Sequence, residues 1–240
     1  GAAARMDTGN LKKGRFYGVS VGPGDPELLT LKAVRCLERC PVLAAPQTAS
    51  GRMLALDIAR GAADLRGKTI LPLHFVMSRE EEALRASHQE AAEKVRACLD
   101  AGQDVAMLNL GDVSVYATYG YLEEILKEQG YETYRIAGVP SFCAAAARLG
   151  CTQTGGVEQP LANAPRGQVD DALGAPGTKV RMKTGPRLPR TLEALVRHGL
   201  LEKSAMVCNC GLPEEAVFPA LTDYDPAQDA GYFATILVKE

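Results

Sequence analysis

The sequence lacks any apolar run that approaches the roughly 18 residues needed to span a membrane. It also lacks a charged amino-terminal region followed by an apolar stretch, the pattern of a secretory signal. Neither sign of charge dominates, because 27 Lys and Arg face 29 Asp and Glu for a net charge of −2. We therefore expect a cytoplasmic protein with no membrane contact and no nucleic-acid partner.

Paired cysteine spacing of the kind that builds a zinc site is also missing, although the chain has seven cysteines. Cys36 and Cys40 stand one helical turn apart, and Cys208 and Cys210 share one face of a predicted strand. A metal site at either pair stays an open alternative. We expect most of the seven cysteines to be buried thiols, and no metal.

Strand and helix patterns alternate along the 240 residues, which predicts parallel βαβ units. We expect one domain over 15–130, a second over 131–240, and an irregular start over 1–14. Asp25 is predicted to cap a helix that begins at Pro26, and Ser78 to cap the helix that Gly102 ends. Residues 151–177 are expected to be mostly irregular. The predicted strands are 15–21, 41–45, 68–73, 105–108, 133–136, 179–182, 205–209 and 232–238, and the other predicted helices are 52–60, 120–129, 142–149 and 189–198.

The stretch Asp104–Tyr119 is expected to form the floor of a ligand site. Val105–Leu108 is a continuous apolar run, typical of a strand buried on both faces. Gly111 and Asp112 follow it, and ligands of open α/β sheets bind outside the carboxyl ends of strands. An ordinary Gly-Asp turn is an equally supported alternative.

A glycine-rich turn, Gly22–Asp25, follows the first predicted strand and raises the question of a dinucleotide site. The third glycine of that pattern is missing. Asp25 would also occupy the helix start that a pyrophosphate needs. We reject the dinucleotide interpretation.

Five segments in one order resemble the tetrapyrrole methylases of cobalamin biosynthesis, and the resemblance covers about residues 15–240. A sixth, LPLHFVMSREEE at 71–82, resembles the branch that methylates carbon 20 of precorrin-2 or cobalt-factor II. The five segments are VGPGDPELLTLKA at 21–33, LGDVSVYATYGYL at 110–122, AGVPSFCAAAARLG at 137–150, MKTG at 182–185 and YFATILV at 232–238.

The resemblance implies a class III methyltransferase fold of two αβα domains with S-adenosylmethionine in the cleft between them. It also implies a tetrapyrrole substrate, S-adenosylhomocysteine as product, and a homodimer. By position, the cofactor contacts fall on Pro23, Leu110, Gly111, Asp112, Val115, Pro140, Ser141, Met182, Lys183, Cys210 and Thr235.

For such a reaction the enzyme contributes mainly alignment and exclusion of water, because a meso carbon of a reduced tetrapyrrole can attack the activated methyl itself. His74 and Tyr116 are the candidate bases for the displaced proton; ordinary packing is the alternative for each. A carbon-11 or carbon-17 methylase, a ribosomal-RNA or diphthamide-type methylase, and a non-catalytic S-adenosylmethionine-binding module remain alternatives. Cationic candidates for the substrate carboxylates are Arg52, Arg79, Lys183, Arg187 and Arg190.

Overall fold

The computed structural model describes residues 12–153, 161–163, 173–174, 177–182, 187–231 and 233–239. The chain divides into two compact units. The first holds the chain up to Gly22 together with Pro26–Val139, and the second holds Pro23–Asp25 together with the chain from Pro140 on. Within these described ranges, no helix is long and apolar enough to cross a bilayer.

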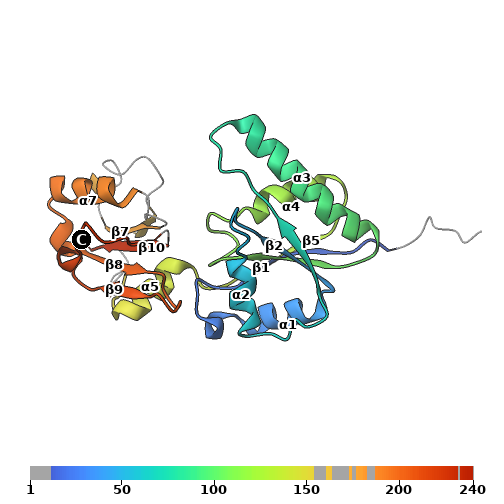
Figure 1. Cartoon of the computed structure of the whole chain (residues 1–240), viewed down its shortest axis with the longest axis horizontal. Coiled ribbons are helices and arrows are strands. Elements are labelled where there is room, and N and C mark those ends of the chain that lie inside the picture. The colour runs from blue at the N-terminus through green and yellow to red at the C-terminus, as the bar shows by residue number, and fades with distance from the viewer. Residues whose placement is uncertain are drawn as a thin grey trace, which may run out of the picture. The chain divides into compact units, whose positions relative to one another are not determined.

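The first unit is a parallel five-stranded sheet in the order β3-β2-β4-β1-β5. Helices α1 and α2 lie on one face of this sheet, and α3 and α4 lie on the other (Figure 1). The strands are β1 (Phe16–Ser20), β2 (Val42–Pro46), β3 (Thr69–Leu73), β4 (Val105–Asn109) and β5 (Thr133–Ile136); the helices are η2 (Pro26–Leu28), α1 (Leu31–Arg39), α2 (Leu54–Arg60), α3 (Glu81–Asp100) and α4 (Tyr119–Glu128).

The core of this unit lies around the central strands β1 and β4, which are buried along their whole length. Tyr119 is fully buried, and its hydroxyl donates hydrogen bonds to the carbonyls of Phe16 (3.2 Å) and Tyr134 (2.8 Å). Gly18 makes room for that ring, because a Cβ there would lie 2.5 Å from it. The Tyr119 ring therefore links α4 to the sheet, and it fits because residue 18 of β1 has no side chain.

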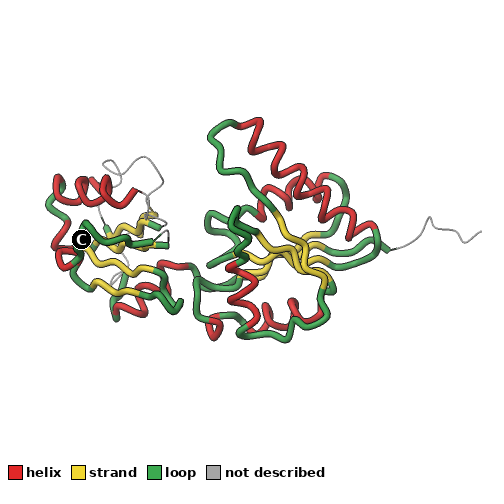
Figure 2. The backbone as a smooth tube through the Cα atoms, in the orientation of Figure 1, coloured by secondary structure: helices red, strands yellow, loops and turns green. Residues whose placement is uncertain are grey.

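The second unit is a five-stranded sheet in the order β6-β7-β10-β8-β9, in which only the β6–β7 pair is parallel. Figure 2 shows these strands in yellow with helices in red beside them. The strands are β6 (Leu161–Asn163), β7 (Thr178–Arg181), β8 (Ser204–Cys208), β9 (Ala216–Phe218) and β10 (Ala234–Val238); the helices are α5 (Ser141–Leu149), α7 (Leu188–Arg197), η4 (Leu201–Lys203) and η5 (Leu221–Asp223).

Both faces of this sheet carry apolar side chains, which is why β8 and β10 are largely apolar runs despite being antiparallel. On one face, Val180 and Leu237 pack with Ala146 of α5. On the other, Ile236 packs in a cluster with Leu195 of α7. The expectation of parallel βαβ units throughout is therefore wrong for the second sheet, because burial on both faces does not report strand direction.

Two predicted helix caps are also wrong. Pro26–Leu28 forms a short 3-10 turn, and α1 starts five residues after Pro26, at Leu31, where the Thr30 hydroxyl accepts from the Ala33 N–H (3.0 Å). Ser78 does not cap α3, because its hydroxyl accepts from the N–H of Glu80, which precedes the helix (3.1 Å). In both places a local hydrogen bond positions the chain just ahead of the helix.

The predicted boundary at Gly130 precedes a strand that belongs to the first sheet. β5 pairs with β1 from Phe16↔Thr133 to Val19↔Ile136. The two units separate only after Val139. The glycine signal marks the end of α4 rather than the end of the unit, since helix ends and unit boundaries share the same turn residues.

Candidate functional site

Loops from the carboxyl ends of β1 and β4 meet through two glycines. The Gly22 N–H donates to the Gly111 carbonyl (3.2 Å), and the Gly111 N–H donates to the Gly22 carbonyl (2.9 Å). Their φ angles are 73° and 65°, in the left-handed region that favours glycine. The backbone thus runs without side chains at the carboxyl ends of the strands, where ligands of open α/β sheets bind, and both glycines are buried.

Ser20 joins a third loop to this pair. Its fully buried hydroxyl accepts from the Val113 N–H (2.8 Å) and donates to the Ile136 carbonyl (2.7 Å). Next to it stands Gly138, where a Cβ would lie 2.4 Å from the Ser20 Cβ. The ends of β1, β4 and β5 are therefore fixed against one another by one hydroxyl and one missing side chain.

Asp112 completes this group of loops at the ends of β1, β4 and β5. We call it the loop cluster, and its residues are Ser20, Gly22, Gly111, Asp112, Val113 and Gly138. One carboxylate oxygen accepts from the Gly138 N–H (2.8 Å), and the other accepts from the N–H (2.8 Å) and the hydroxyl of Ser114. Burial raises the pKa of this carboxyl, but hydrogen bonds from Ser114 and Gly138 and the charge of Arg135 outweigh it and lower the pKa. Asp112 is therefore an anion whose hydrogen bonds join two loops, a role that the sequence alone did not predict.

Tyr116 lies in the loop that Asp112 opens and has a left-handed backbone, with φ of 51°. Its side chain is 58% exposed. Such a conformation is unfavourable for a residue with a Cβ and is a recognised mark of functional loops. The predicted base candidate is therefore reachable from solvent and held in a strained loop beside the loop cluster.

His74, the other base candidate, follows the edge strand β3 and is exposed. Its carbonyl accepts from the Ser87 hydroxyl (3.4 Å). β2 lies between β3 and β4, so the strands that carry the two candidates run about 10 Å apart. The geometry favours Tyr116 over His74 as the group nearer the loop cluster.

In the second unit, the turn Pro23–Asp25 packs against the turn after β8. A Cβ on Gly24 would lie 2.2 Å from the Cys210 carbonyl oxygen, and one on Gly211 would lie 2.5 Å from the Asp25 nitrogen. Burial raises the pKa of Cys210, so its sulfur stays protonated. Cys210 contributes its backbone carbonyl to this contact.

Three other predicted contacts lie at the start of α5 or bond to it. Pro140 stands at the N-cap position, and the Ser141 hydroxyl hydrogen-bonds the Met182 sulfur (3.0 Å) at the end of β7. Thr235 is buried in β10 opposite Val207. Lys183 lies outside the described residues.

A family model described as Tetrapyrrole (Corrin/Porphyrin) Methylases matches residues 15–223 of this chain. The chain belongs to this family. Its relatives include the cobalt-precorrin-2 C(20)-methyltransferase of Salmonella typhimurium, 32% identical over 95% of this chain and 97% of that protein. The precorrin-2 C(20)-methyltransferase of a Sinorhizobium species is 31% identical over 94% of this chain and 95% of that protein.

Solved structures of this family share the fold. A cobalt precorrin-4 methyltransferase superposes with a TM-score of 0.70 at 19% identity and covers 94% of each chain. The uroporphyrin-III C-methyl transferase of Thermus thermophilus, solved with S-adenosyl homocysteine, gives 0.66 at 22% identity and covers 95% of this chain and 92% of that one. The predicted family, the α/β fold class and the predicted class of enzyme, a tetrapyrrole methylase, are confirmed.

The sequence located the loop cluster but missed two of the residues that build it. Ser20 is a polar residue inside the apolar run Phe16–Val21, and a buried polar group in a strand is the signal that could have found it. Gly138 lies in the segment 137–150, and nothing in that pattern marks its close contact with Ser20. Of the predicted contacts, Leu110, Gly111, Asp112 and Val115 lie in the first unit, and Pro23, Pro140, Ser141, Met182, Cys210 and Thr235 lie in the second.

Proposed function

We propose that this methylase transfers the methyl group of S-adenosylmethionine to carbon 20 of precorrin-2 or of its cobalt-containing form. The observation that carries the proposal is identity above 30% over nearly the whole of two relatives that are named for this position. A precorrin-4 C(11)-methyltransferase of Pseudomonas aeruginosa matches only 58% of the chain, at 29% identity. Carbon 20 is therefore preferred to carbon 11.

The loop cluster fits the methyl donor. Gly22 and Gly111 present backbone without side chains at the ends of β1 and β4, and a lowered pKa keeps Asp112 negative beside them. S-adenosylmethionine is a sulfonium cation without phosphates, so the negative charge of Asp112 favours it over a dinucleotide. We assign the first unit's contacts to Leu110–Val115. The second unit's proposed contacts are Pro23, Pro140, Ser141, Met182, Lys183, Cys210 and Thr235.

Bound S-adenosylmethionine supplies an activated methyl group that a nucleophilic carbon can take directly. The tied loops contribute alignment, because Ser20 and Asp112 fix the ends of three strands before any ligand arrives. The exposed Tyr116 hydroxyl is the group that we assign to relay the proton lost from the methylated carbon, and His74 is the second candidate. The protein is expected to work as a homodimer.

The deciding experiment is to incubate the protein with S-adenosylmethionine and either precorrin-2 or cobalt-factor II. A product one methyl group heavier is expected by mass spectrometry. A ¹³C-labelled methyl donor then allows the substituted carbon to be read by NMR. Label at carbon 11 or 17 would move the protein to another branch of the family.

A binding measurement separates enzyme from binding module. Calorimetry with S-adenosylhomocysteine should give saturable binding in either case. Binding without any methylated product from either tetrapyrrole would show a module that retains the cofactor loops and lacks the reaction.

A further inference from the structure

A cavity of about 360 Å³ lies in the first unit between α1 and the strands β1 and β5. Its apolar wall is the stacked pair Tyr17 and Tyr134, whose ring centroids are 5.3 Å apart. It lies along the α1 face of the sheet, whereas the loop cluster lies at the carboxyl ends of the strands. We call it the thiol pocket, because Cys36 contributes to its lining.

Positive charge surrounds the mouth of the thiol pocket. Lys32, Arg35 and Arg39 follow one another along α1, and all three are exposed. The Arg39 guanidinium lies 5.5 Å from the centre of the Tyr17 ring, which holds it over the pocket. Arg135 also lines the pocket, but Glu123 neutralises it through two hydrogen bonds of 2.9 Å. Three cations therefore remain without a carboxylate among the ion pairs of the described chain.

Cys36 does not stand alone. Its sulfur lies 3.9 Å from the sulfur of Cys40, and both side chains are buried. A disulfide requires a sulfur–sulfur distance of about 2.05 Å. Cys40 is the residue at which α1 ends, with an extended ψ of 130°, so the closing movement falls on a residue outside the regular helix.

The two thiols differ in acidity in the direction that exchange chemistry needs. A hydrogen bond from Cys40 lowers the pKa of Cys36, and the charge of Arg39 adds to this against the effect of burial. The Cys40 pKa is raised, first by that hydrogen bond and then by burial. Burial raises the pKa of Cys98 and Cys208 as well. Cys36 is thus the thiol more easily converted to the thiolate, which is the nucleophile.

We propose that Cys36 and Cys40 form a redox-active thiol pair that reacts with an anionic low-molecular-weight disulfide entering through the thiol pocket. The Cys36 thiolate attacks one sulfur of the small disulfide, a bond forms between them, and one thiolate leaves. Cys40 then loses its proton to water and attacks the Cys36 sulfur. The Cys36–Cys40 bond forms and the second small thiolate leaves. The protein gives up two electrons, and the small disulfide is reduced to two thiols.

The test uses reduced full-length protein and oxidised glutathione, which carries net negative charge. Trypsin cuts after Arg39, so Cys36 and Cys40 fall on separate peptides, and a bond between them is read directly as a linked pair by mass spectrometry. The linked pair is expected after incubation with oxidised glutathione and should disappear with dithiothreitol. Cys40→Ser should stop at glutathione attached to Cys36.

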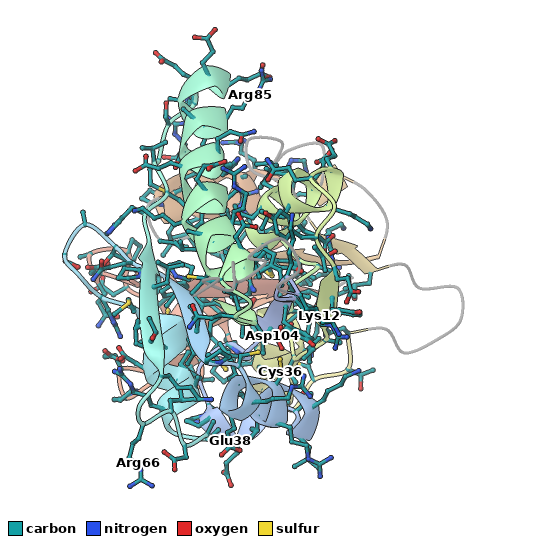
Figure 3. All side chains as sticks on the ribbon, turned by 90° about the vertical axis from the view of Figure 1, so that its right-hand side faces the viewer. Lys12, Cys36, Glu38, Arg66, Arg85 and Asp104 are labelled. Atoms are coloured by element: carbon teal, nitrogen blue, oxygen red, sulfur yellow. The ribbon has the colours of Figure 1, made fainter. Side chains whose placement is uncertain are left out.

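Charge selectivity is measured with Lys32→Gln/Arg35→Gln. Removing two charges from the mouth should slow the reaction with oxidised glutathione by about tenfold, since local fields of this kind change association rates by at least that factor. The cationic disulfide cystamine should not be slowed. The matched control is Arg66→Gln/Arg85→Gln, which removes two charges from sites remote from Cys36, as Figure 3 shows. It should leave both rates unchanged.

Two results would overturn the proposal. One is glutathione on Cys36 without any Cys36–Cys40 linkage in the wild-type protein, which would show that the pair cannot close. The other is equal slowing of both disulfides in Lys32→Gln/Arg35→Gln, which would remove the electrostatic role of the pocket. The wild-type linkage needs no variant, so a variant that fails to fold leaves the first result decisive.

Discussion

Replacing Gly138 with alanine should disturb the loop cluster through one methyl group. The new Cβ would lie 2.4 Å from the Ser20 Cβ and 3.2 Å from the Gly111 carbonyl oxygen. Carbon atoms in favourable contact stand about 3.5–4.0 Å apart, so one segment has to move by about 1 Å. Ser20 cannot yield freely, because its hydroxyl is bonded at both ends.

The expected loss has two parts. Overpacking of a tight site costs about 1–3 kcal/mol of unfolding free energy. Displacement of the Gly138 N–H also weakens its hydrogen bond to Asp112, and bonds to charged groups contribute about 1.5–3 kcal/mol. Urea denaturation of Gly138→Ala should therefore show a loss of at least ~1 kcal/mol. If the cofactor site is where we propose, turnover should fall by about 100-fold, because a shift of about 1 Å is enough.

Gly120→Ala is the matched control. Its Cβ would meet only the Arg135 guanidinium at 3.5 Å, an ordinary contact within α4. Gly120 is the second residue of α4, and alanine in place of a helical glycine should stabilise the protein by at most roughly 0.5–1 kcal/mol. A double-mutant cycle adds Ser20→Gly, which removes the atom that clashes, so the pair should be less destabilising than the sum of the single changes. Additive effects, or wild-type stability in Gly138→Ala, would refute the tight packing on which the reasoning depends.

Four further outcomes follow from the site. Gly111→Val should abolish S-adenosylhomocysteine binding by calorimetry, because a branched residue is strained at φ 65° and its side chain would displace the buried backbone of the loop cluster; unchanged affinity would move the site elsewhere. Asp112→Asn should cost stability at neutral pH, and because the Asp112 pKa is lowered, that difference should shrink as pH falls below about 4; urea midpoints across pH measure it. Light scattering should give a homodimer at micromolar concentration. Cys143→Ser and Cys210→Ser should each lower turnover by at most about tenfold, since direct methyl transfer needs no thiol; complete loss with binding intact would contradict it.

The strands of the first unit were predictable because each is a short run of strand-forming residues between turn residues, and β1, β4 and most of β2 are buried besides. β5 has the predicted bounds, and β4 extends the predicted 105–108 by Asn109. The direction of the second sheet was not predictable, because Val207 and Leu237 sit in short apolar runs that read alike in parallel and antiparallel sheets. β9 was missed because Ala216–Phe218 is short and only half-buried.

Helix starts failed for a different reason. Asp25 and Pro26 form a favourable pattern for a helix start, yet the chain first makes a 3-10 turn. The helix α1 begins only after its N-cap residue, Thr30. Residues with short polar side chains can satisfy several competing local hydrogen bonds, and the sequence does not say which is used. For the same reason the sequence did not reveal the role of Asp112, whose carboxylate oxygens accept hydrogen bonds from the N–H groups of Ser114 and Gly138.

That use of Asp112 changes how the loop cluster can favour a cation. A carboxylate whose oxygens already accept three hydrogen bonds is poorly placed for direct contact with a sulfonium, but it keeps its full charge because its pKa is lowered. Its attraction then acts over a few ångströms, where the effective dielectric constant makes it modest. The larger proposed contribution is rigidity. The Asp112 carboxylate and the Ser20 hydroxyl order the loops before a ligand arrives, so the loops lose less conformational freedom on binding. If S-adenosylmethionine binds where we propose, the site therefore depends more on side chains that hold the backbone in place than on side chains that touch the ligand.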